Sequence, residues 1–286
     1  MKEVVVLSGK GGTGKTSILG AFATLSKKKA LADCDVDAAD LHLLLNPRVR
    51  EHEEFWSGQV ALIDEDKCTR CGLCEELCRF DAIADFTVDP VACEGCGFCA
   101  HACPESAIIM NDERAGDYFV SETKYGPLVH ARLGIAQENS GKLVAQVRKK
   151  AKEIAEREGF EYILSDGPPG IGCPVISSIS GVNLALLVTE PTLSGMHDLE
   201  RVQGVLRHFG IRSAVCINKW DLNEENTRKI ERYCANEGLC VVSKIPYDDV
   251  FTEAMVHGLP VIEYAQGPVS MEIENMWRSV VRLLAQ

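Results

Sequence analysis

A glycine-rich loop directly follows the first apolar run of the chain. Val4–Leu7 is a short apolar segment, typical of a buried parallel strand. It leads into Gly9–Thr16, which fits G-x-x-x-x-G-K-[ST] over its full length, and a helical pattern begins at about Lys15. In such a loop the backbone N–H groups turn toward phosphate oxygens at the N-terminus of the helix. This order of elements predicts an α/β fold with a phosphate site between the first strand and the first helix.

The same loop supplies the first candidate site residues. Lys15 is expected to contact the β and γ phosphates of a nucleotide, and the Thr16 hydroxyl is expected to reach Mg²⁺. A tight turn that binds nothing is the alternative, but the lysine, the threonine and the flanking strand are all present. The predicted nucleotide-contacting residues of the loop are Gly9, Gly11, Gly12, Thr13, Gly14, Lys15 and Thr16.

Alternating strand and helix patterns continue along most of the chain. They predict an α/β fold with a mostly parallel sheet and helices on both faces. A helix is expected over Ser140–Arg157, and an amphipathic C-terminal helix over Met271–Leu284 is expected to pack on the core. Further strands are expected at Ala30–Ala32, Leu128–Leu133, Tyr162–Leu164, Leu184–Val188, Ala214–Ile217 and Val241–Ile245.

Composition changes between about Gln59 and Asp112, where eight of the thirteen cysteines lie and a pattern occurs twice. Each copy has the spacing C-x2-C-x2-C-x3-C, which resembles the two-cluster ferredoxins, although Arg79 follows the first copy where Pro104 follows the second. In that family the fourth cysteine of each run ligates the other cluster. The resemblance therefore implies two [4Fe–4S] clusters, one held by Cys68, Cys71, Cys74 and Cys103 and the other by Cys93, Cys96, Cys99 and Cys78.

Zinc is the rival metal for these cysteines. It prefers paired C-x2-C ligands around one tetrahedral ion, and two triple-plus-one runs fit this pattern poorly. The predicted organisation is an inserted α+β ferredoxin-like domain over residues 59–112. It interrupts a P-loop ATPase domain formed by residues 1–58 and 113–286, because the sheet needs strands from both sides of the insertion.

The loop also contains an extra lysine, Lys10, in the form K-G-G-x-G-K-[ST]. This form resembles the deviant Walker A motif of the MinD/ParA/Mrp ATPases, which have the SIMIBI type of P-loop NTPase fold. The resemblance implies that Lys10 reaches the partner's phosphates in a nucleotide-bound homodimer. It also implies a catalytic group of Lys10, Lys15 and Asp35, in which Asp35 positions the attacking water.

Two further carboxylates are candidate Mg²⁺ ligands together with Thr16. Asp33 lies in the segment Asp33-Cys34-Asp35, which resembles the switch segment of that family, and Asp166 begins a segment similar to its Walker B region. Carboxylate oxygens are suitable ligands for Mg²⁺. Acids so close together can instead be solvated loop charge or helix caps, which is the interpretation given to Asp37.

A base-recognition site is predicted where the strand at Ala214–Ile217 ends. Asn218-Lys219-Trp220-Asp221 matches N-K-x-D, which recognises guanine in G-proteins, while a MinD-like ATPase uses an asparagine here against adenine. Asn218 and Asp221 are therefore candidate nucleotide contacts. ATP is favoured because of the deviant loop, and GTP remains open.

The overall composition excludes several function classes. A formal net charge of −12 argues against sequence-independent DNA binding, and no apolar stretch is long enough for a transmembrane helix. We expect no nucleic-acid or membrane partner and no signal peptide. Thirteen cysteines without a secretion signal indicate metal ligation in a reducing compartment, and hence the cytoplasm. Cys34, Cys216, Cys234 and Cys240 are expected to be buried packing residues, as is Cys173 unless it shares a bridging metal in a dimer.

These features predict an ATP-hydrolysing iron–sulfur protein with ATP, Mg²⁺ and two [4Fe–4S] clusters. The expected role is metallocofactor assembly or ATP-gated electron delivery to a redox or client protein. The alternatives are a spatial organiser of the MinD/ParA kind and a redox-gated regulator in which the clusters are structural or sensory.

Overall fold

The computed structural model describes residues 1–134 and 140–286, which form two compact units. The large unit contains Met1–Glu53, Tyr118–Arg132 and Ser140–Gln286. The small unit contains Glu54–Asp117 and the described part of Leu133–Asn139. Its main segment therefore extends a few residues beyond the composition changes at Gln59 and Asp112, because regular strands continue across them.

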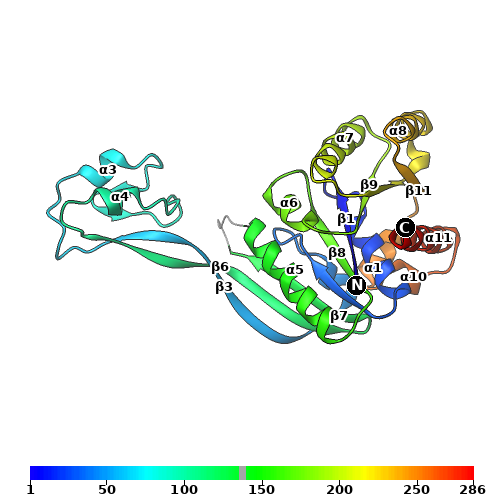
Figure 1. Ribbon diagram of the computed structural model, residues 1–286, viewed down its shortest axis with the longest axis horizontal. Helices are drawn as coiled ribbons and strands as arrows, with labels where there is room; N and C mark the ends of the chain where they lie inside the picture. The colour runs from blue at the N-terminus through cyan, green and yellow to red at the C-terminus, as the bar shows by residue number, and fades with distance from the viewer. Residues whose placement is uncertain (135–139) are drawn as a thin grey trace. The chain divides into compact units, whose positions relative to one another are not determined.

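A nine-stranded sheet has the order β11–β10–β9–β1–β8–β2–β7–β6–β3 (Figure 1). Parallel pairing joins β1 to β8 and β9, β10 to β9 and β11, and β2 to β8 and β7, which confirms a mostly parallel sheet. The strands are β1 (Lys2–Ser8), β2 (Lys29–Asp33), β3 (Arg48–Ile63), β6 (Ile108–Thr123), β7 (Gly126–Leu133), β8 (Tyr162–Pro169), β9 (Leu184–Thr189), β10 (Ser213–Asn218) and β11 (Cys240–Ile245).

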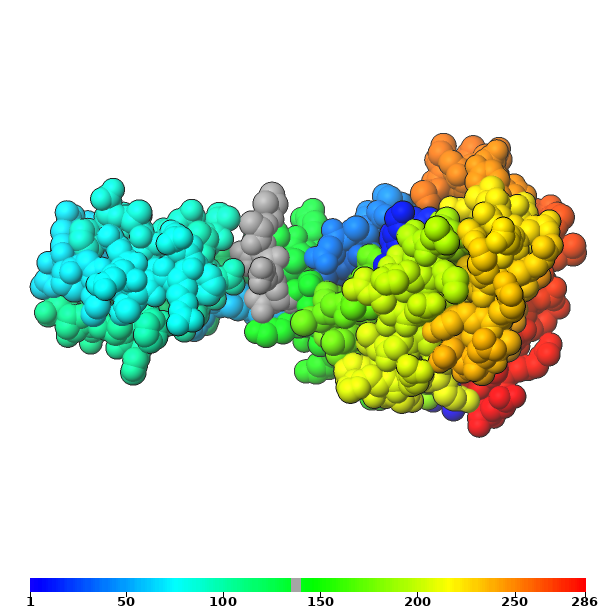
Figure 2. Space-filling model, turned by 90° about the horizontal axis from the view of Figure 1, so that it is seen from above, coloured from blue at the N-terminus to red at the C-terminus, as the bar shows by residue number. Residues whose placement is uncertain are grey.

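Helices cover both faces of this sheet. The side chains of β1 point alternately to the two faces and so belong to two hydrophobic cores. Val4 and Val6 pack with α1 and α11, while Val5 and Leu7 pack with α6, α7 and α8 on the opposite face. Figure 2 shows α7 and α8 side by side on the surface of the large unit, in yellow-green and yellow. The helices are α1 (Lys15–Leu25), α2 (Leu41–Leu45), α5 (Ser140–Arg157), α6 (Cys173–Ile179), α7 (Leu193–His208), α8 (Glu224–Asn236), α9 (Val250–Val256), α10 (Val261–Tyr264) and α11 (Pro268–Ala285).

The predicted long helices are confirmed. The helix expected over Ser140–Arg157 is α5, and α11 buries Ile273, Met276 and Val280 in the core, as expected for a packing helix. Strand β8 is longer than predicted and continues to Pro169, so Asp166 lies within the strand. Within the described ranges, no helix is both long and apolar enough to cross a membrane.

Two 16-residue strands, β3 and β6, were not predicted from the sequence. They carry many charged residues in place of a continuous apolar run, so neither has the signature of a buried strand. β6 turns into β7 through Lys124 and Tyr125, which makes this pair a hairpin. Arg50 of β3 contacts Glu122 of β6, while Gln59 further along β3 contacts Asp112, as expected for antiparallel neighbours.

The small unit is built from very short elements in two similar halves. It contains α3 (Leu73–Leu77), α4 (Phe98–Ala102) and the antiparallel pair β4 (Ile83–Ala84) and β5 (Thr87–Val88). A glycine in the left-handed region precedes each helix: Gly72 with φ 80° and Gly97 with φ 71°. The internal repeat of the sequence is therefore also a repeat of backbone conformation.

Candidate functional site

The glycine-rich loop joins β1 to α1 and requires glycine at specific positions. Gly12 and Gly14 have φ values of 80° and 92°, a region that other residues rarely adopt. A Cβ atom at Gly14 would lie 2.6 Å from Nδ2 of Asn218, and one at Gly9 would collide with Asp198 of α7. Gly9 thus serves close packing against α7, whereas Gly12 and Gly14 shape the turn.

Lys15 lies at the start of α1, with its side chain only 6% exposed. Its Nζ is 3.9 Å from Oδ2 of Asp35, in the segment that follows β2. Burial raises the pKa of Asp35, while the charge of Lys15 opposes this rise. The structure therefore brings together the lysine predicted to contact the phosphates and the carboxylate predicted to position the attacking water.

Thr16 and Asp166 form the candidate Mg²⁺ position. The Thr16 hydroxyl donates a hydrogen bond of 2.6 Å to Oδ2 of Asp166, in β8. Oδ1 of Asp166 is buried and has no hydrogen-bond partner among the described residues. Burial raises the pKa of Asp166 to about 6, against the effects of Lys15 and the Thr16 hydroxyl. A hydroxyl beside a buried, unsatisfied carboxylate oxygen fits a hard cation such as Mg²⁺.

Asp33 is placed differently from the other predicted Mg²⁺ ligands. It is fully buried at the end of β2, and its two carboxylate oxygens accept hydrogen bonds from the backbone N–H groups of Asp35 and Leu41, each at 3.2 Å. Burial raises the pKa of Asp33, and the neighbouring carboxylate of Asp166 adds to the rise. These contacts hold the segment between β2 and α2, which carries Asp35.

The two residues predicted for base recognition are separated by the structure. Asn218 donates from Nδ2 to the carbonyl of Thr13, at 2.9 Å, and so holds the glycine-rich loop to the end of β10. Asp221 lies in the 3₁₀-helix η1 (Trp220–Leu222), where its Oδ1 accepts a hydrogen bond of 2.7 Å from the backbone N–H of Tyr247. Its position fastens the loop after β11.

A cavity of about 640 Å³ opens at this end of the sheet, within the range of small-molecule sites. The predicted site residues outside its lining, as the described residues define it, are Gly9, Lys10, Thr13, Asp33, Asp166 and Asp221, and the Lys10 side chain is exposed. The predicted residues that line it are Gly11, Gly12, Gly14, Lys15, Thr16, Asp35 and Asn218. The Thr13 hydroxyl is buried beneath the loop and has no hydrogen-bond partner among the described residues.

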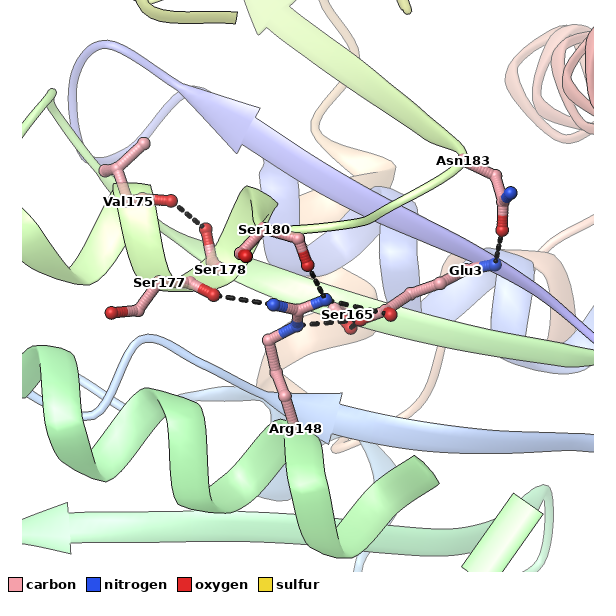
Figure 3. Close-up of polar contacts among 8 residues, drawn as sticks. All are labelled: Glu3, Arg148, Ser165, Val175, Ser177, Ser178, Ser180 and Asn183. Carbon is pink, nitrogen blue, oxygen red and sulfur yellow. Dashed lines mark hydrogen bonds and ion pairs between the residues drawn. The ribbon is translucent and has the colours of Figure 1, made fainter. Parts of the chain in front are cut away.

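A partly buried ion pair joins elements on either side of β8. Arg148 of α5 donates to both carboxylate oxygens of Glu3 in β1, at 2.8 and 2.9 Å, and to the carbonyls of Ser177 and Ser180 at the end of α6 (Figure 3). Ser165, next to Asp166, contacts the same carboxylate. Because α6 begins at Cys173, this network positions the segment between Asp166 and α6.

The eight predicted cluster ligands line two separate cavities in the small unit. Each has a volume of about 20 Å³, against about 640 Å³ for the cavity of the large unit. In each cavity, three cysteines of one run meet the fourth cysteine of the other. One is lined by Cys68, Cys71, Cys74 and Cys103, and the other by Cys78, Cys93, Cys96 and Cys99.

In the described part of the chain, no three His, Cys, Asp or Glu side chains form a group that could hold one metal ion. Burial raises the pKa of the Cys74 and Cys99 thiols, one in each cavity. A soft cation that binds thiolate would reverse this effect. Four thiols around one space are a suitable donor set for an iron–sulfur cluster.

A family model described as the CobQ/CobB/MinD/ParA nucleotide-binding domain (CbiA) matches residues 4–261. The chain belongs to this family. It is a P-loop ATPase, and ATP and Mg²⁺ are its cofactors.

Similar sequences support this membership. Uncharacterized protein MJ0578 of Methanocaldococcus jannaschii is 36% identical over 228 residues, which cover 78% of this chain and 80% of that protein. The septum site-determining protein MinD of Thermotoga maritima is 24% identical over 292 residues, or 97% of this chain and 87% of that protein.

Solved structures show the same fold. The septum site-determining protein MinD of Pyrococcus horikoshii, complexed with Mg-ADP, gives a TM-score of 0.59 at 18% identity and covers 99% of this chain and 96% of that one. The MinC:MinD cell division protein complex of Aquifex aeolicus gives a TM-score of 0.60 at 20% identity, with the same coverage.

Sequence reasoning missed much of the apolar wall of the ATPase cavity. Leu43 of α2 and Phe251 and Met255 of α9 contribute to this wall. Helix α9 has only seven residues, too few for a clear period. The available signal was the pair of apolar doublets Val250-Phe251 and Ala254-Met255 soon after a strand, spaced as on one face of a helix.

Two of the five cysteines outside the repeated runs are exposed, although they were predicted to be buried. Cys34, Cys216 and Cys234 are buried, as predicted, but Cys240 is exposed, and its prediction as a buried residue was wrong. Cys240 begins β11, the edge strand of the sheet, so no further strand covers it on that side. Cys173 is exposed at the start of α6, which contradicts its interpretation as a buried packing residue.

Proposed function

We propose that the chain is an iron–sulfur ATPase that acts as a nucleotide-switched homodimer. Two [4Fe–4S] clusters lie in the segment 59–112, inserted between the ATPase segments 1–58 and 113–286. The protein acts in the cytoplasm, in metallocofactor assembly or in ATP-gated electron delivery to a partner protein. The proposal rests mainly on the exchange of Cys78 and Cys103 between the two cysteine-lined cavities.

This exchange favours clusters over zinc. A zinc ion needs four sulfurs close around one centre, and neighbouring C-x2-C pairs supply them readily. A cubane cluster has its iron atoms at separate corners, so its thiolates come from more widely spaced positions. Three cysteines from one run with a fourth from the other run meet this need in both cavities. When bound, the clusters supply one-electron redox chemistry.

The ATPase residues divide the work of phosphoryl transfer. Lys15 neutralises charge on the transferred phosphoryl group, while Thr16 and Asp166 hold Mg²⁺. Asp35 lines the same cavity and orients the attacking water. Asp33 acts by fixing the loop that carries Asp35, because its oxygens are occupied by backbone N–H groups.

The exposed Lys10 supports a homodimer. It lies on the glycine-rich loop outside the lining of its own cavity, so it is free to reach the phosphates bound by a second copy. Cys173 is exposed at the first residue of α6, and it remains a proposed ligand of a metal shared by two copies.

A second candidate function follows from the relatives. The similarity to septum site-determining proteins MinD favours a spatial organiser, or a redox-gated regulator, in which the clusters are structural or sensory. In that case nucleotide turnover would be independent of the clusters' ability to pass electrons to a partner.

One paired measurement separates these functions. The rate of cluster reduction and the rate of ATP hydrolysis are measured in anaerobic protein, for the wild type, Lys15→Ala and Asp35→Ala. We expect ATP to change the reduction rate of the wild type, and both variants to lose this response together with about 100-fold or more of the hydrolysis. Equal reduction rates with and without ATP in the wild type would eliminate ATP-gated electron delivery and favour the second candidate.

A further inference from the structure

The two cysteine-lined cavities have equivalent ligands but different walls. Aligning the runs from Cys68 and Cys93 makes Leu73 equivalent to Phe98, and Phe80 equivalent to Glu105. The exchange of the fourth cysteine brings Phe98 and Phe80 to one cavity and Leu73 and Glu105 to the other. The two halves of the repeat therefore differ at both of these wall positions. At each position the phenylalanine lies in the same cavity.

Both phenylalanines of this cavity are exposed to solvent. The Phe80 side chain is 45% exposed and that of Phe98 is 53% exposed, although both are large and apolar. At the other cavity the equivalent residues are the half-buried Leu73 and the charged, exposed Glu105. Exposed aromatic residues grouped at one place are typical of the centre of a protein interface.

The segment that carries this pair is strongly acidic. The segment Glu54–Asp117 contains 14 Asp and Glu residues against 4 Lys and Arg, a net charge of −10 out of −12 for the whole chain. Glu94 is itself part of the wall of the Phe80 and Phe98 cavity. An apolar centre in a strongly acidic field is complementary to a surface with an apolar centre and a basic rim.

We propose that the face around Cys78, Cys93, Cys96 and Cys99 is the docking surface for a basic one-electron carrier protein, with Phe80 and Phe98 as its apolar centre. This inference rests on the proposed function, because it assumes that a cluster occupies the cavity. One electron passes between this site and the partner's redox group. The donor is oxidised by one electron and the acceptor reduced by one, and no atom or proton is transferred.

Oxidised cytochrome c, a basic carrier with an exposed haem edge, is a suitable probe. Its dissociation constant is measured by calorimetry at low ionic strength with the oxidised holoprotein, so that binding is observed without electron transfer. The test variant combines Phe80→Glu with Phe98→Leu, which gives this cavity the residues of the other one at these two positions. We expect affinity to fall about tenfold or more, because two aromatic contacts are lost at the centre of the interface.

A transplant variant is the matched control. Adding Leu73→Phe and Glu105→Phe to the test variant moves the aromatic pair to the other cavity and restores the net charge. We expect it to recover most of the affinity. Charge alone predicts the opposite order, since Phe80→Glu adds a negative charge and should tighten binding to a basic protein. Unchanged or tighter binding by the test variant would overturn the proposal.

Iron and acid-labile sulfide are assayed in every sample. A wild type without clusters would overturn both the proposed function and this inference. Clusters present in all variants, with equal affinities, would overturn the docking surface alone. Sedimentation of the wild type and the test variant completes the test. Loss of self-association in the test variant would instead assign the aromatic pair to contact with a second copy and overturn the proposal.

Discussion

The large unit and the small unit differ in how much apolar side chain they bury. The large unit buries long apolar side chains on both faces of a parallel sheet, including Phe22, Leu31 and Leu164. The buried apolar residues described in the small unit are Ala61, Ala82, Ile83, Ala107, Ile108 and Ala115. Burying a large aliphatic side chain contributes about 1.5–3 kcal/mol, while ordering each residue costs about 1–2 kcal/mol. We therefore expect the small unit, unlike the large unit, to need bound metal to hold its fold.

The largest expected effect is the loss of order in the small unit without iron. In protein produced and kept free of iron and zinc, we expect backbone amides of residues 54–117 to lose protection from hydrogen exchange by about 100-fold or more. Amides of β1 and β8 should keep theirs. Mass spectrometry of exchanged peptides measures both regions in one sample. Equal protection of residues 54–117 with and without metal would show that the small unit stabilises itself.

Substitutions in the glycine-rich loop of the large unit should change the rate of ATP hydrolysis without changing the cluster content. Lys15→Ala is expected to lower the ATPase rate about 100-fold or more at every protein concentration, because a buried charge that contacts phosphate is removed. Lys10→Ala, the matched control on the same loop, should abolish only the part of the rate that rises with protein concentration, since its proposed role is in the dimer. Cluster content should remain at the wild-type level in both. A Lys15→Ala protein with wild-type turnover would refute the assigned phosphate site.

Proton binding should oppose Mg²⁺ binding in the large unit. Because the pKa of Asp166 is raised to about 6, its carboxylate is mostly protonated at pH 5 and mostly charged at pH 7. Mg²⁺ affinity should therefore rise about tenfold between pH 5 and pH 7. Titration of Mg²⁺ into the ADP-bound protein measures it.

Asp35→Asn serves as the control for this pH dependence. It removes a neighbouring carboxylate whose pKa is also raised, and it should leave most of the dependence in place. An affinity independent of pH in the wild type would exclude Asp166 as the titrating ligand.

The smallest expected effect is at Asp221. Asp221→Ala removes the acceptor for the N–H of Tyr247 and loosens one wall of the cavity. We expect ATP and GTP affinities to weaken by the same small factor, about two- to fivefold, since one hydrogen bond contributes roughly 0.5–1.5 kcal/mol. Competition binding with both nucleotides measures the ratio. A selective loss of GTP binding would instead support guanine recognition by the N-K-x-D segment.

The two units also differ in how far the sequence predicts them. The glycine-rich loop and the cysteine runs are local patterns, in which backbone conformation or ligand spacing is written into neighbouring residues. They indicated Gly12, Gly14 and Lys15, and also the two sets of four cysteines that line the cavities.

Features set by distant parts of the chain were not predictable in this way. Strand β6 pairs with both β3 and β7, and neither β3 nor β6 has the continuous apolar run of a buried strand. The carboxylate of Asp33 is used by its own loop, and Asp221 is used by a loop after β11. Both depend on contacts that single-sequence patterns do not contain.

The central claim is that one chain combines an ATPase with two clusters that exchange a cysteine. Iron and acid-labile sulfide per chain, measured after anaerobic reconstitution, test it most directly, with Cys103→Ser and Cys78→Ser beside the wild type. The account predicts about eight iron and about eight sulfide in the wild type, and about half of each in either variant, because each serine removes a ligand from one cluster. About two zinc ions per chain without sulfide would contradict it.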